Sequence, residues 1–483
     1  MNPPSLPIAS SSSGLSDATK RILPWLVAVA FFMESLDTTI LNTAVPAISA
    51  ALGVGPLSMK AVLASYTLSL AVFIPISGWM ADRFGTRLVF ASAIGIFTLG
   101  SFLCGISNNI HLLVACRILQ GCGGSMMVPV GRLTLVRTFA KSELLRTMSF
   151  VSIPALVAPM LGPIAGGLIV GYLHWRFIFF LNIPIGLVGL ILVYMHLPDY
   201  REEKTHPLDV VGLILFGSGI GLLSYVLEIF GEHTLSSREM SGLLAMSLAL
   251  LVGYWIHSRS VEFPLLDLKL FAIRTFRAAV SGSFFTRLGI GGVPFLLPLL
   301  YQVGLGFSPV QSGMLVMPQA LAAMSMKVIM PKLLRSVGYR GVLISNTVIL
   351  GVLLMVFATI GLRTPVWAIV LQAFFYGAFT SLQYTSMNTL VYADIPERDA
   401  SSASSIASTL QQMSISFGVA IAGLATAFFV PASHSNPGEM IHGIHKALMA
   451  LGILTIVSTM VFRSLKRGDG DDVSLHTVPH PDG

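Results

Sequence analysis

The chain has 483 residues, of which 54% are hydrophobic and only 11% are charged, and its mean hydropathy is +0.80. Soluble domains usually carry about 25% charged residues, so this composition excludes a water-soluble globular protein and requires lipid as the solvent for much of the chain. The formal net charge is +7, from 29 Lys and Arg against 22 Asp and Glu, and such an excess indicates either a nucleic-acid partner or membrane topology.

Residues 1–21 are polar and rich in Ser and Pro, which predicts a disordered tail. The apolar run that follows begins at Ile22 and is longer than the core of a signal peptide, and no A-x-A cleavage site comes after it. We therefore expect this run to be retained as the first membrane helix.

Further apolar runs follow through the whole chain. A membrane-spanning helix needs about 20 mostly apolar residues, and in lipid its backbone groups must be hydrogen-bonded within the segment. We expect an all-α integral membrane protein with fourteen transmembrane helices, at residues 22–46, 59–81, 88–107, 110–136, 145–172, 175–197, 208–229, 239–257, 275–303, 309–333, 341–361, 364–391, 401–430 and 440–462.

The Lys and Arg residues indicate the orientation of these spans. An even number of spans places both termini on one side. With cytoplasmic termini, 22 Lys and Arg lie on the inner side and five on the outer side, while Arg117 and Arg287 lie within spans. This asymmetry predicts cytoplasmic termini, and it accounts for the basic excess without a nucleic-acid partner.

The spans divide into groups of six, two and six. RFGTRL (83–88) and RSVGYRGVL (335–343) each follow the second helix of a six-helix group, and both contain a G-x-R turn. Matched halves of this kind are typical of secondary transporters. After the tail, we predict an N-terminal bundle, a linker with two extra transmembrane helices, a C-terminal bundle and a cytoplasmic tail, at 22–198, 199–270, 271–463 and 464–483.

Two carboxylates lie within the first predicted span. Glu34 and Asp37 are three residues apart and so share a helix face, and ionisable groups inside a span by default mark ion pathways. Asp37 and Arg117 lie at depths that differ by only roughly 3 Å along their helices. We expect these three residues to couple transport to protons. The alternatives are a fixed ion pair between two helices and, for Glu34, an inert polar wall residue.

The stretch GWMADRFGTRL (78–88) connects the second and third spans. Its carboxylate and two cations could form a charge latch between helices, or the stretch could be a solvated loop with topogenic charge. We expect a gating role for Gly78, Asp82, Arg83, Gly85 and Arg87.

The fifth predicted span contains two pairs of small or helix-bending residues, Gly162-Pro163 and Gly166-Gly167. Small residues at this spacing let helices approach closely, and a proline can kink a helix. The pattern predicts either a tightly packed helix or a flexing seam between the bundles.

The last six predicted spans contain no Asp or Glu, and Arg287 is their one charge deep within a span. It is either an anion contact in a cavity or an arginine that caps backbone carbonyls at a helix break. Polar residues of the last block that are expected to line the cavity and contact substrate are Gln383, Asn388, Gln411 and Gln412, and Gln120 of the fourth span is a further expected contact.

These stretches resemble a known family. GWMADRFGTRL resembles motif A of the major facilitator superfamily, and ACRILQGCGG (115–124) and APMLGPIAGGL (158–168) resemble motif B and the antiporter motif C. LDTTILNTAVP (36–46) and WRFIFFLNIPIG (175–186) resemble the fourteen-helix drug:proton antiporters of the EmrB/QacA type. SGWMADRFGTR, FTRLG, VPFL and SSASS are similar to the MdtD-type branch.

The resemblance implies the major facilitator fold and a proton-coupled antiporter that exports small molecules by alternating access. It further implies multidrug efflux, a bacterial inner-membrane location, a monomer, and the proton gradient in place of a cofactor. Protonation of Asp37 would release Arg117, and the Asp82 loop would hold the cytoplasmic side shut in the outward-open state. The glycine motif on the fifth span would suppress leak and favour antiport.

Two other functions stay open on the residues alone. Arg287 and the acid-free last block favour export of an anionic metabolite or a metal chelate such as citrate, and a non-transporting membrane sensor is the third possibility. The chain has no G-x-x-x-x-G-K-[ST] loop and no G-x-S-x-G elbow, which argues against an ATP-driven pump and an enzyme. Its three cysteines, Cys104, Cys116 and Cys122, lie in apolar segments and predict neither disulfides nor a metal site.

Overall fold

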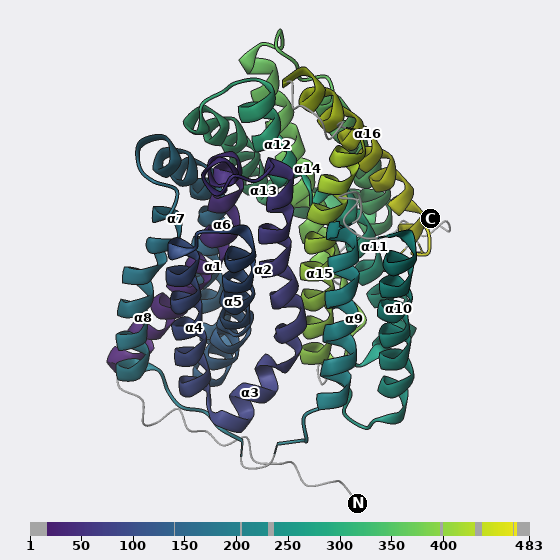
Figure 1. The fold of residues 1–483 in the computed structure, drawn as a ribbon. Helices are drawn as coiled ribbons and strands as arrows, with labels where there is room; N and C mark the ends of the chain where they lie inside the picture. The colour runs from purple at the N-terminus through teal and green to yellow at the C-terminus, as the bar shows by residue number, and fades with distance from the viewer. Residues whose placement is uncertain are drawn as a thin grey trace, which may run out of the picture.

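The computed structural model describes residues 17–139, 141–202, 205–229, 236–396, 399–429, 437–466 and 468–470. Regular secondary structure in this part of the chain is entirely helical (Figure 1). Most of the two predicted tails, residues 1–16 and 471–483, lies outside the described residues.

The N-terminal block begins earlier than the sequence pattern predicts. Its first helix starts at Asp17 and not at Ile22, because Ala, Lys and Arg are good helix formers and Asp is favourable in a first turn. The block comprises α1 (Asp17–Leu52), α2 (Lys60–Phe73), α3 (Ser77–Phe84), α4 (Thr86–Ile106), α5 (Ile110–Thr138), α6 (Lys141–Tyr172), α7 (Phe177–Phe180) and α8 (Asn182–His196), with 3-10 turns at Pro56–Met59 and Ile74–Ile76.

The C-terminal block has the corresponding helices. They are α11 (Arg274–Ile290), α12 (Val293–Leu299), α13 (Pro309–Phe357), α14 (Val366–Leu390), α15 (Ala400–Phe429) and α16 (Pro437–Phe462), with a 3-10 turn at Leu268–Ala272 and a π-helical turn at Leu300–Gly304. The predicted span at 275–303 is therefore interrupted after Ile290, where Gly291 and Gly292 separate α11 from α12.

Helix α13 is two membrane-length helices joined at a sharp bend. It has 49 residues, which at 1.5 Å per residue is about 74 Å, more than twice the thickness of a bilayer core. Gly338 interrupts it with a φ of 73° and a ψ of 163°. This left-handed φ suits glycine, so the second G-x-R turn of the sequence marks a real break between two helices.

Between the blocks, α9 (Val210–Ile229) and α10 (Ser237–Ser260) form a hairpin. Helix α9 packs against α2 and α15, and α10 packs mainly against α9 (Figure 1). The two extra helices predicted in the linker are present, and α9 covers one side of the contact between the blocks.

A polar clasp closes the base of this hairpin. Nε2 of His257 lies 2.7 Å from Oδ1 of Asp209, and the backbone N–H groups of Gly212 and Leu265 donate to the same carboxylate at 2.7 and 3.1 Å. Burial raises the pKa of Asp209, but these hydrogen bonds outweigh burial and hold the pKa below its usual value. The clasp ties the start of α9 to the end of α10.

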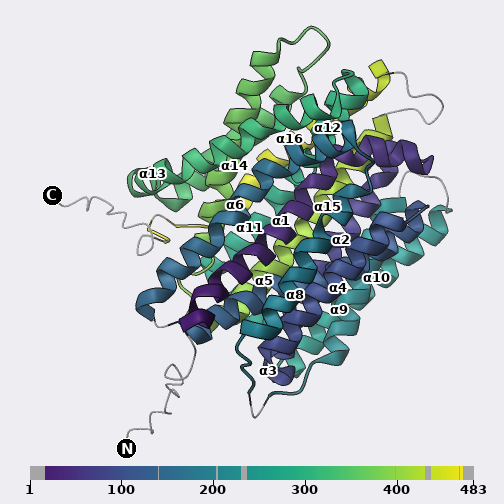
Figure 2. The ribbon, with the colours of Figure 1, turned by 90° about the vertical axis from the view of Figure 1, so that its left-hand side faces the viewer.

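The two blocks meet along α2–α15 and α6–α13, and α1 also contacts α12. Figures 1 and 2 show α2 beside α15 and α1 running the length of the bundle. At the end away from the described chain termini, one hydrophobic core includes residues of both blocks, such as Ile48, Trp175 and Tyr301. There Gln302 Nε2 donates to the carbonyl of Thr43 at 2.8 Å. The blocks are therefore joined at this end.

At the opposite end the blocks have separate cores. The N-terminal core includes Leu23, Val89 and Leu197, and the C-terminal core includes Phe276 and Phe462. Both described chain termini lie at this end, since α1 begins and α16 finishes there. The cleft between the blocks thus lies on the side of the chain termini.

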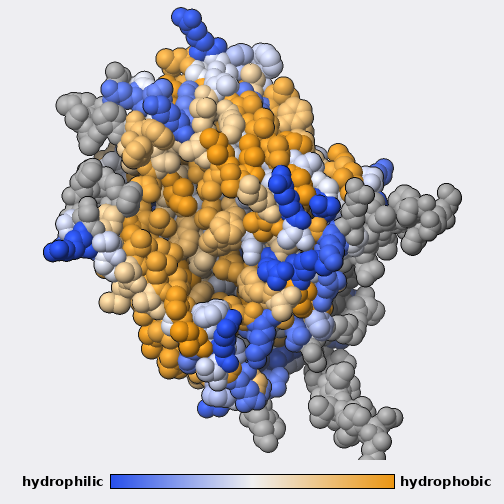
Figure 3. Space-filling model, turned by 90° about the vertical axis from the view of Figure 1, so that its right-hand side faces the viewer, coloured by the Kyte–Doolittle hydropathy of each residue, from blue (hydrophilic) through white to orange (hydrophobic). Residues whose placement is uncertain are grey.

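One broad face of the bundle is largely apolar. Figure 3 shows hydrophobic residues over most of the broad middle of one face, with hydrophilic residues toward its edges. Among the described residues, twelve helices are long and apolar enough to cross a membrane. That count takes α13 as one span and omits α6, of which Val157–Tyr172 is counted as a shorter apolar helix.

Candidate functional site

The predicted pair of Asp37 and Arg117 is formed. Nη1 of Arg117 lies 2.6 Å from Oδ2 of Asp37, and both side chains are 1% exposed. The similar depths of the two residues on α1 and α5 led to this prediction, which the geometry confirms. A buried ion pair is tolerated only when further hydrogen bonds satisfy both groups.

Three more polar side chains supply those hydrogen bonds. Gln120 Nε2 donates to Asp37 Oδ1 at 2.8 Å and to Ser101 Oγ at 2.7 Å, and its Oε1 accepts from Arg117 at 2.7 Å. Asn182 Nδ2 donates to Asp37 Oδ1 at 3.1 Å. Gln120 was expected to contact substrate, and this stays a prediction: in this structure the side chain is fully buried and its amide is hydrogen-bonded within the N-terminal block.

Helix α2 completes the surroundings of Arg117. The guanidinium lies 4.2 Å from the ring centroid of Tyr66, a distance at which cation–π attraction operates, and Nε donates to the carbonyl of Val62 at 3.4 Å. The network therefore joins α1, α2, α4, α5 and α8. Sequence analysis missed Ser101 and Asn182, although Asn182 stands out as a polar residue in the apolar stretch WRFIFFLNIPIG.

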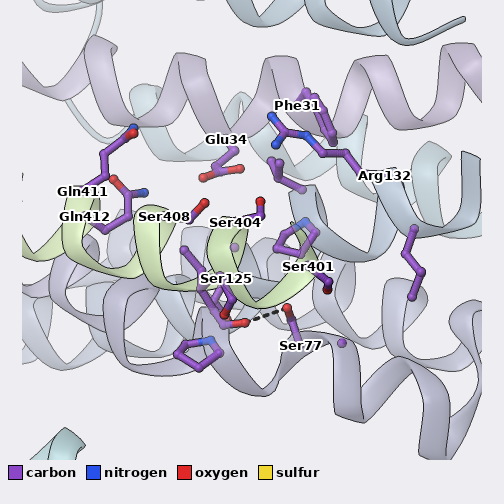
Figure 4. A pocket seen from close by; sticks show the side chains of 18 of the residues that line it. Phe31, Glu34, Ser77, Ser125, Arg132, Ser401, Ser404, Ser408, Gln411 and Gln412 are labelled. Atoms are coloured by element: carbon purple, nitrogen blue, oxygen red, sulfur yellow. Dashed lines mark hydrogen bonds between the residues drawn. The ribbon is translucent and has the colours of Figure 1, made fainter. Parts of the chain in front are cut away.

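A cavity of about 570 Å³ lies between the blocks on the side of the chain termini. Glu34 lines it from α1, and Gln411 and Gln412 line it from α15 as predicted. Figure 4 shows Ser404 and Ser408 of α15 across the cavity from Glu34. Glu34 and Asp37 therefore have different surroundings, one in the cleft and one inside the N-terminal block.

The Glu34 carboxylate is only partly satisfied. Its Oε2 is buried without a hydrogen-bond partner in the described structure. Arg132 of α5 lines the same cavity, with its guanidinium carbon 5.5 Å from the ring centroid of Phe31. A carboxylate oxygen that is unbonded at a cleft can take up a proton, or it can accept a hydrogen bond from a bound molecule.

A second cavity of about 440 Å³ is lined by α1, α6, α12, α13 and α14. Asn388 lines it as predicted, together with Tyr384 and Lys327. Lys327 places a cation at this cavity. The lining residues include no Asp or Glu, so this cavity carries positive charge only.

Arg287 lies directly behind this second cavity. It is 2% exposed, and its guanidinium carbon lies 3.7 Å from the ring centroid of the cavity residue Tyr384. It donates to Ser283 Oγ at 2.9 Å and to Gln411 Oε1 at 3.4 Å. The described residues place no carboxylate within ion-pair distance of it, and its partners are side chains instead of the backbone carbonyls that a helix-capping role requires.

Gln383, which was expected to contact substrate, holds two helices of the C-terminal block together in this structure. Its Nε2 donates to Thr347 Oγ1 at 2.8 Å and its Oε1 accepts from Asn346 at 2.7 Å. The side chain is fully buried and lines neither cavity. It joins the second half of α13 to α14.

The stretch 78–88 is bound to its own block. Asp82 pairs with Arg137 at 2.8 Å, and Arg137 also pairs with Glu202 at 2.9 Å. Neither of the predicted cations contacts Asp82: Arg83 is exposed, and Arg87 Nε donates to the carbonyl of Leu197 at 2.6 Å. Sequence analysis missed Arg137 because it lies 55 residues away at the end of α5.

Gly78 and Gly85 of this stretch differ in their surroundings. Gly85 has a φ of 94°, and a side chain there would collide with Asp199, so glycine is required for both reasons. Gly78 has open space where a side chain would stand, and it lines the cleft opposite the start of α15. A helix of the opposite block therefore has room to pack against Gly78 when the blocks approach each other.

The glycines of α6 pack against both blocks. Side chains at Gly162 and Gly166 would collide with Thr39 and Ile40 of α1, and one at Gly167 would come within 2.5 Å of the Pro309 carbonyl. In return, α13 presents a glycine to α6, since a side chain at Gly313 would collide with the Pro163 carbonyl. The predicted close approach is present, and α6 lies on the seam between the blocks.

Two helical blocks with cavities at their interface, and a buried ion pair within one block, define a multi-pass membrane transporter and not an enzyme. Residues 27–419 match the sequence profile of the Major Facilitator Superfamily. The chain belongs to this superfamily, as its motifs led us to expect.

Two relatives are both named "Putative multidrug resistance protein MdtD". The protein from Serratia proteamaculans (strain 568) is 41% identical over 419 residues, which cover 85% of this chain and 88% of the relative. The protein from Escherichia coli O7:K1 is 42% identical over 415 residues, which cover 86% and 88%. The expected likeness to the MdtD-type branch is thereby confirmed.

Solved structures share the fold at low sequence identity. A bacterial homologue of the human lysosomal transporter Spinster, in an inward-facing conformation, has a TM-score of 0.65 and 14% identity, and covers 96% of this chain and 100% of its own. The inward-open xylose transporter XylE from E. coli has a TM-score of 0.63 and 13% identity, and covers 95% and 99%.

Proposed function

We propose that the protein is a proton-coupled antiporter that exports small molecules, of the multidrug-efflux type, across the bacterial inner membrane. It works by alternating access as a monomer, with the proton gradient as its energy source. The relatives named for multidrug resistance support the substrate class. The antiporter-type glycine motif on α6, packed on the seam between the blocks, supports the exchange mode.

The observation that carries this proposal is the buried pair of Asp37 and Arg117. An ion pair inside a membrane bundle is costly, and its usual use is to take up and release an ion. A proton on Asp37 would remove the charge that holds Arg117, and the network reaches five helices of the block. Protonation can therefore change how these helices pack.

The topology that we propose has fourteen spans and cytoplasmic termini. Adding α6 and the second half of α13 to the twelve apolar helices gives fourteen, and the Lys and Arg asymmetry supports the orientation. The cleft at the end of the chain termini then faces the cytoplasm. With this topology the structure is an inward-facing state. In this state the Asp82 stretch pairs with Arg137 and does not hold the described part of the C-terminal block.

Transport by an Asp37→Asn variant in proteoliposomes tests the coupling. A panel of cationic and neutral dyes is loaded, and export is followed with and without an imposed pH gradient. We expect the variant to lose the acceleration by the gradient, because its amide cannot take up a proton, while Glu262→Gln at an exposed loop position keeps it. Undiminished acceleration in Asp37→Asn would refute the assignment, and a wild-type protein that moves no substrate would favour a sensor.

A second candidate substrate class is an anionic metabolite or a metal chelate. It is favoured by Lys327 in the second cavity and by Arg287 behind it, neither of which has a carboxylate partner among the described residues. Arg287 is buried, and a buried cation without a counter-charge is unfavourable; a bound anion would supply that charge.

Substrate charge separates the two candidates. If the substrate is anionic, Arg287→Ala and Lys327→Ala should each abolish export of a tricarboxylate in proteoliposomes. Dye export that is unchanged by Arg287→Ala, with no tricarboxylate export by the wild type, would instead support the cationic or neutral class.

A further inference from the structure

Helix α10 is the most lipid-exposed helix of the bundle. It packs mainly on α9, with a smaller contact to the 3-10 turn at Leu268–Ala272. Only 11% of its most apolar window is buried. Val252 and Ile256 near its end are 53% and 56% exposed, so this helix offers an apolar surface that suits the acyl chains of a bilayer.

A cavity of about 540 Å³ opens where α10 finishes, between that helix and the following 3-10 turn. Two cations line it, Arg259 from the helix and Lys269 from the turn, together with the aromatic rings of Trp255 and Phe271. The remaining lining residues are Ser258, Leu268 and Ala272.

Arg259 is held in place by stacking. Its guanidinium carbon lies 3.8 Å from the ring centroid of Trp255, one helical turn earlier. Stacking uses the face of the guanidinium and leaves its N–H edge free to bind an oxyanion. The cation is therefore oriented before any ligand arrives.

Neither cation is neutralised within the described structure. No carboxylate there lies within 4.0 Å of Arg259 or Lys269, and the cavity lining includes no Asp or Glu. Asp267 is close in sequence, but its carboxylate accepts from the backbone N–H of Lys269 at 3.1 Å, and Glu262 is exposed elsewhere on the connecting segment.

The other end of the same hairpin has the opposite character. A cavity of about 600 Å³ there is lined by Tyr225, Glu239, Gly242, Leu243 and Met246. It contains a carboxylate and no cation. The basic, aromatic cavity is therefore specific to the end of α10 that we place at the cytoplasmic face.

We propose that the cavity of Trp255, Arg259 and Lys269 binds the phosphate of an anionic membrane lipid from the cytoplasmic leaflet. Aromatic and basic side chains at the end of a lipid-facing helix match a headgroup, and the exposed Val252 and Ile256 above them match its acyl chains. A free phosphate would leave that apolar surface unused. The leaflet rests on the proposed topology, whereas the binding itself does not.

Lipid binding to the purified full-length chain tests this proposal. The protein is delipidated, titrated with phosphatidylglycerol or phosphatidylcholine, and analysed by native mass spectrometry. We expect preferential retention of phosphatidylglycerol, and a drop in its affinity of about tenfold or more in the Arg259→Gln, Lys269→Gln double variant. Arg238→Gln, at the other end of α10, is the matched control and should bind as the wild type does.

Both substituted side chains are exposed, so the fold should be kept, and size-exclusion profiles check this. The charge-preserving pair Arg259→Lys and Lys269→Arg should retain most of the binding, which separates lost charge from lost structure. Equal retention of phosphatidylglycerol by the double Gln variant and the wild type would overturn the proposal. So would equal binding of phosphatidylcholine, or displacement of the lipid by millimolar inorganic phosphate, which would indicate a free-anion site.

Discussion

Asp37 and Glu34 are separated by a single turn of α1, yet they meet different surroundings. Asp37 accepts from Arg117, Gln120 and Asn182 inside the N-terminal block. Glu34 lines the cleft with one oxygen unsatisfied. A helix rotates about 100° per residue, so neighbours on one broad face can still point into a block and into a cleft.

The buried pair makes a prediction about stability. Asp37→Asn should destabilise the protein by about 3–5 kcal/mol, because it leaves the Arg117 charge buried without its counter-charge. Adding Arg117→Gln should restore most of that loss, since the double variant buries no charge. Thermal unfolding in detergent measures both effects. A double variant that is as unstable as the sum of its single variants would show that the two side chains are not coupled.

Two glutamines of the C-terminal block form a matched pair. Gln383→Ala should cost about 1–3 kcal/mol of stability and leave substrate preference unchanged, because it removes the buried hydrogen bonds of Gln383 with Asn346 and Thr347 and leaves the Asn346 amide only its bond to the Phe379 carbonyl. Gln411→Ala should have little effect on stability and should alter the apparent affinity for substrate, because Gln411 lines the cleft. Thermal unfolding and substrate competition assays separate the two. The reverse pattern would contradict the assignment of which residue lines the cavity.

At the scale of elements, α6 is the helix on which both blocks depend. Its glycines touch α1 on one side and the first turns of α13 on the other. Helices that approach this closely can slide only if no side chain stands between them. Close packing at the seam is thus compatible with sliding of α6 and α13 past each other.

Adding one methyl group to this seam should impair transport. Gly167→Ala and Gly313→Ala each place a Cβ against a backbone carbonyl of the facing helix in the other block, so we expect strongly reduced export rates. Gly221→Ala on α9 has open space and should keep transport while gaining up to about 1 kcal/mol of stability from helix propensity. Initial export rates at equal protein density provide the comparison, and normal export by Gly167→Ala would show that the seam tolerates a looser contact.

On the scale of the whole molecule, the two blocks share a core at one end only. The shared core contains residues from both blocks, whereas at the end of the chain termini each block has its own. If the protein works by the alternating access that we propose, this shared core must separate when the opposite side closes. The contacts at the joined end are therefore specific to this state.

A cross-link at the joined end should trap this state. Gln302 donates to the carbonyl of Thr43 across the two blocks, so Thr43→Cys and Gln302→Cys, in a background without the native cysteines, should be bridged by a short bis-methanethiosulfonate reagent, which spans more than the reach of a direct disulfide. We expect export to stop on cross-linking and to recover on reduction, as measured in one proteoliposome sample. Full export by the cross-linked protein would mean that this end does not open during transport.

Several features follow from the sequence for local reasons. Run length and hydropathy are properties of consecutive residues, and they predict the membrane helices and the extra pair at 199–270. The break at Gly338 follows from its G-x-R turn. The pairing of Asp37 with Arg117 follows from depth along two helices, because depth is counted in residues.

Other features depend on how each helix is rotated about its axis, which its neighbours decide. Gln383 and Gln411 look alike in the sequence, but one is buried in a block and the other lines the cleft. Two further contacts likewise form only when distant helices pack together. They are the ion pair of Asp82 with Arg137 and the hydrogen bond from Asn182 to Asp37. The sequence by itself determined a membrane bundle of two helical blocks with a charged pair at one depth. Only the tertiary structure decided which polar side chains hold a block together and which face the cleft, since burial is settled by the helices that come to lie alongside.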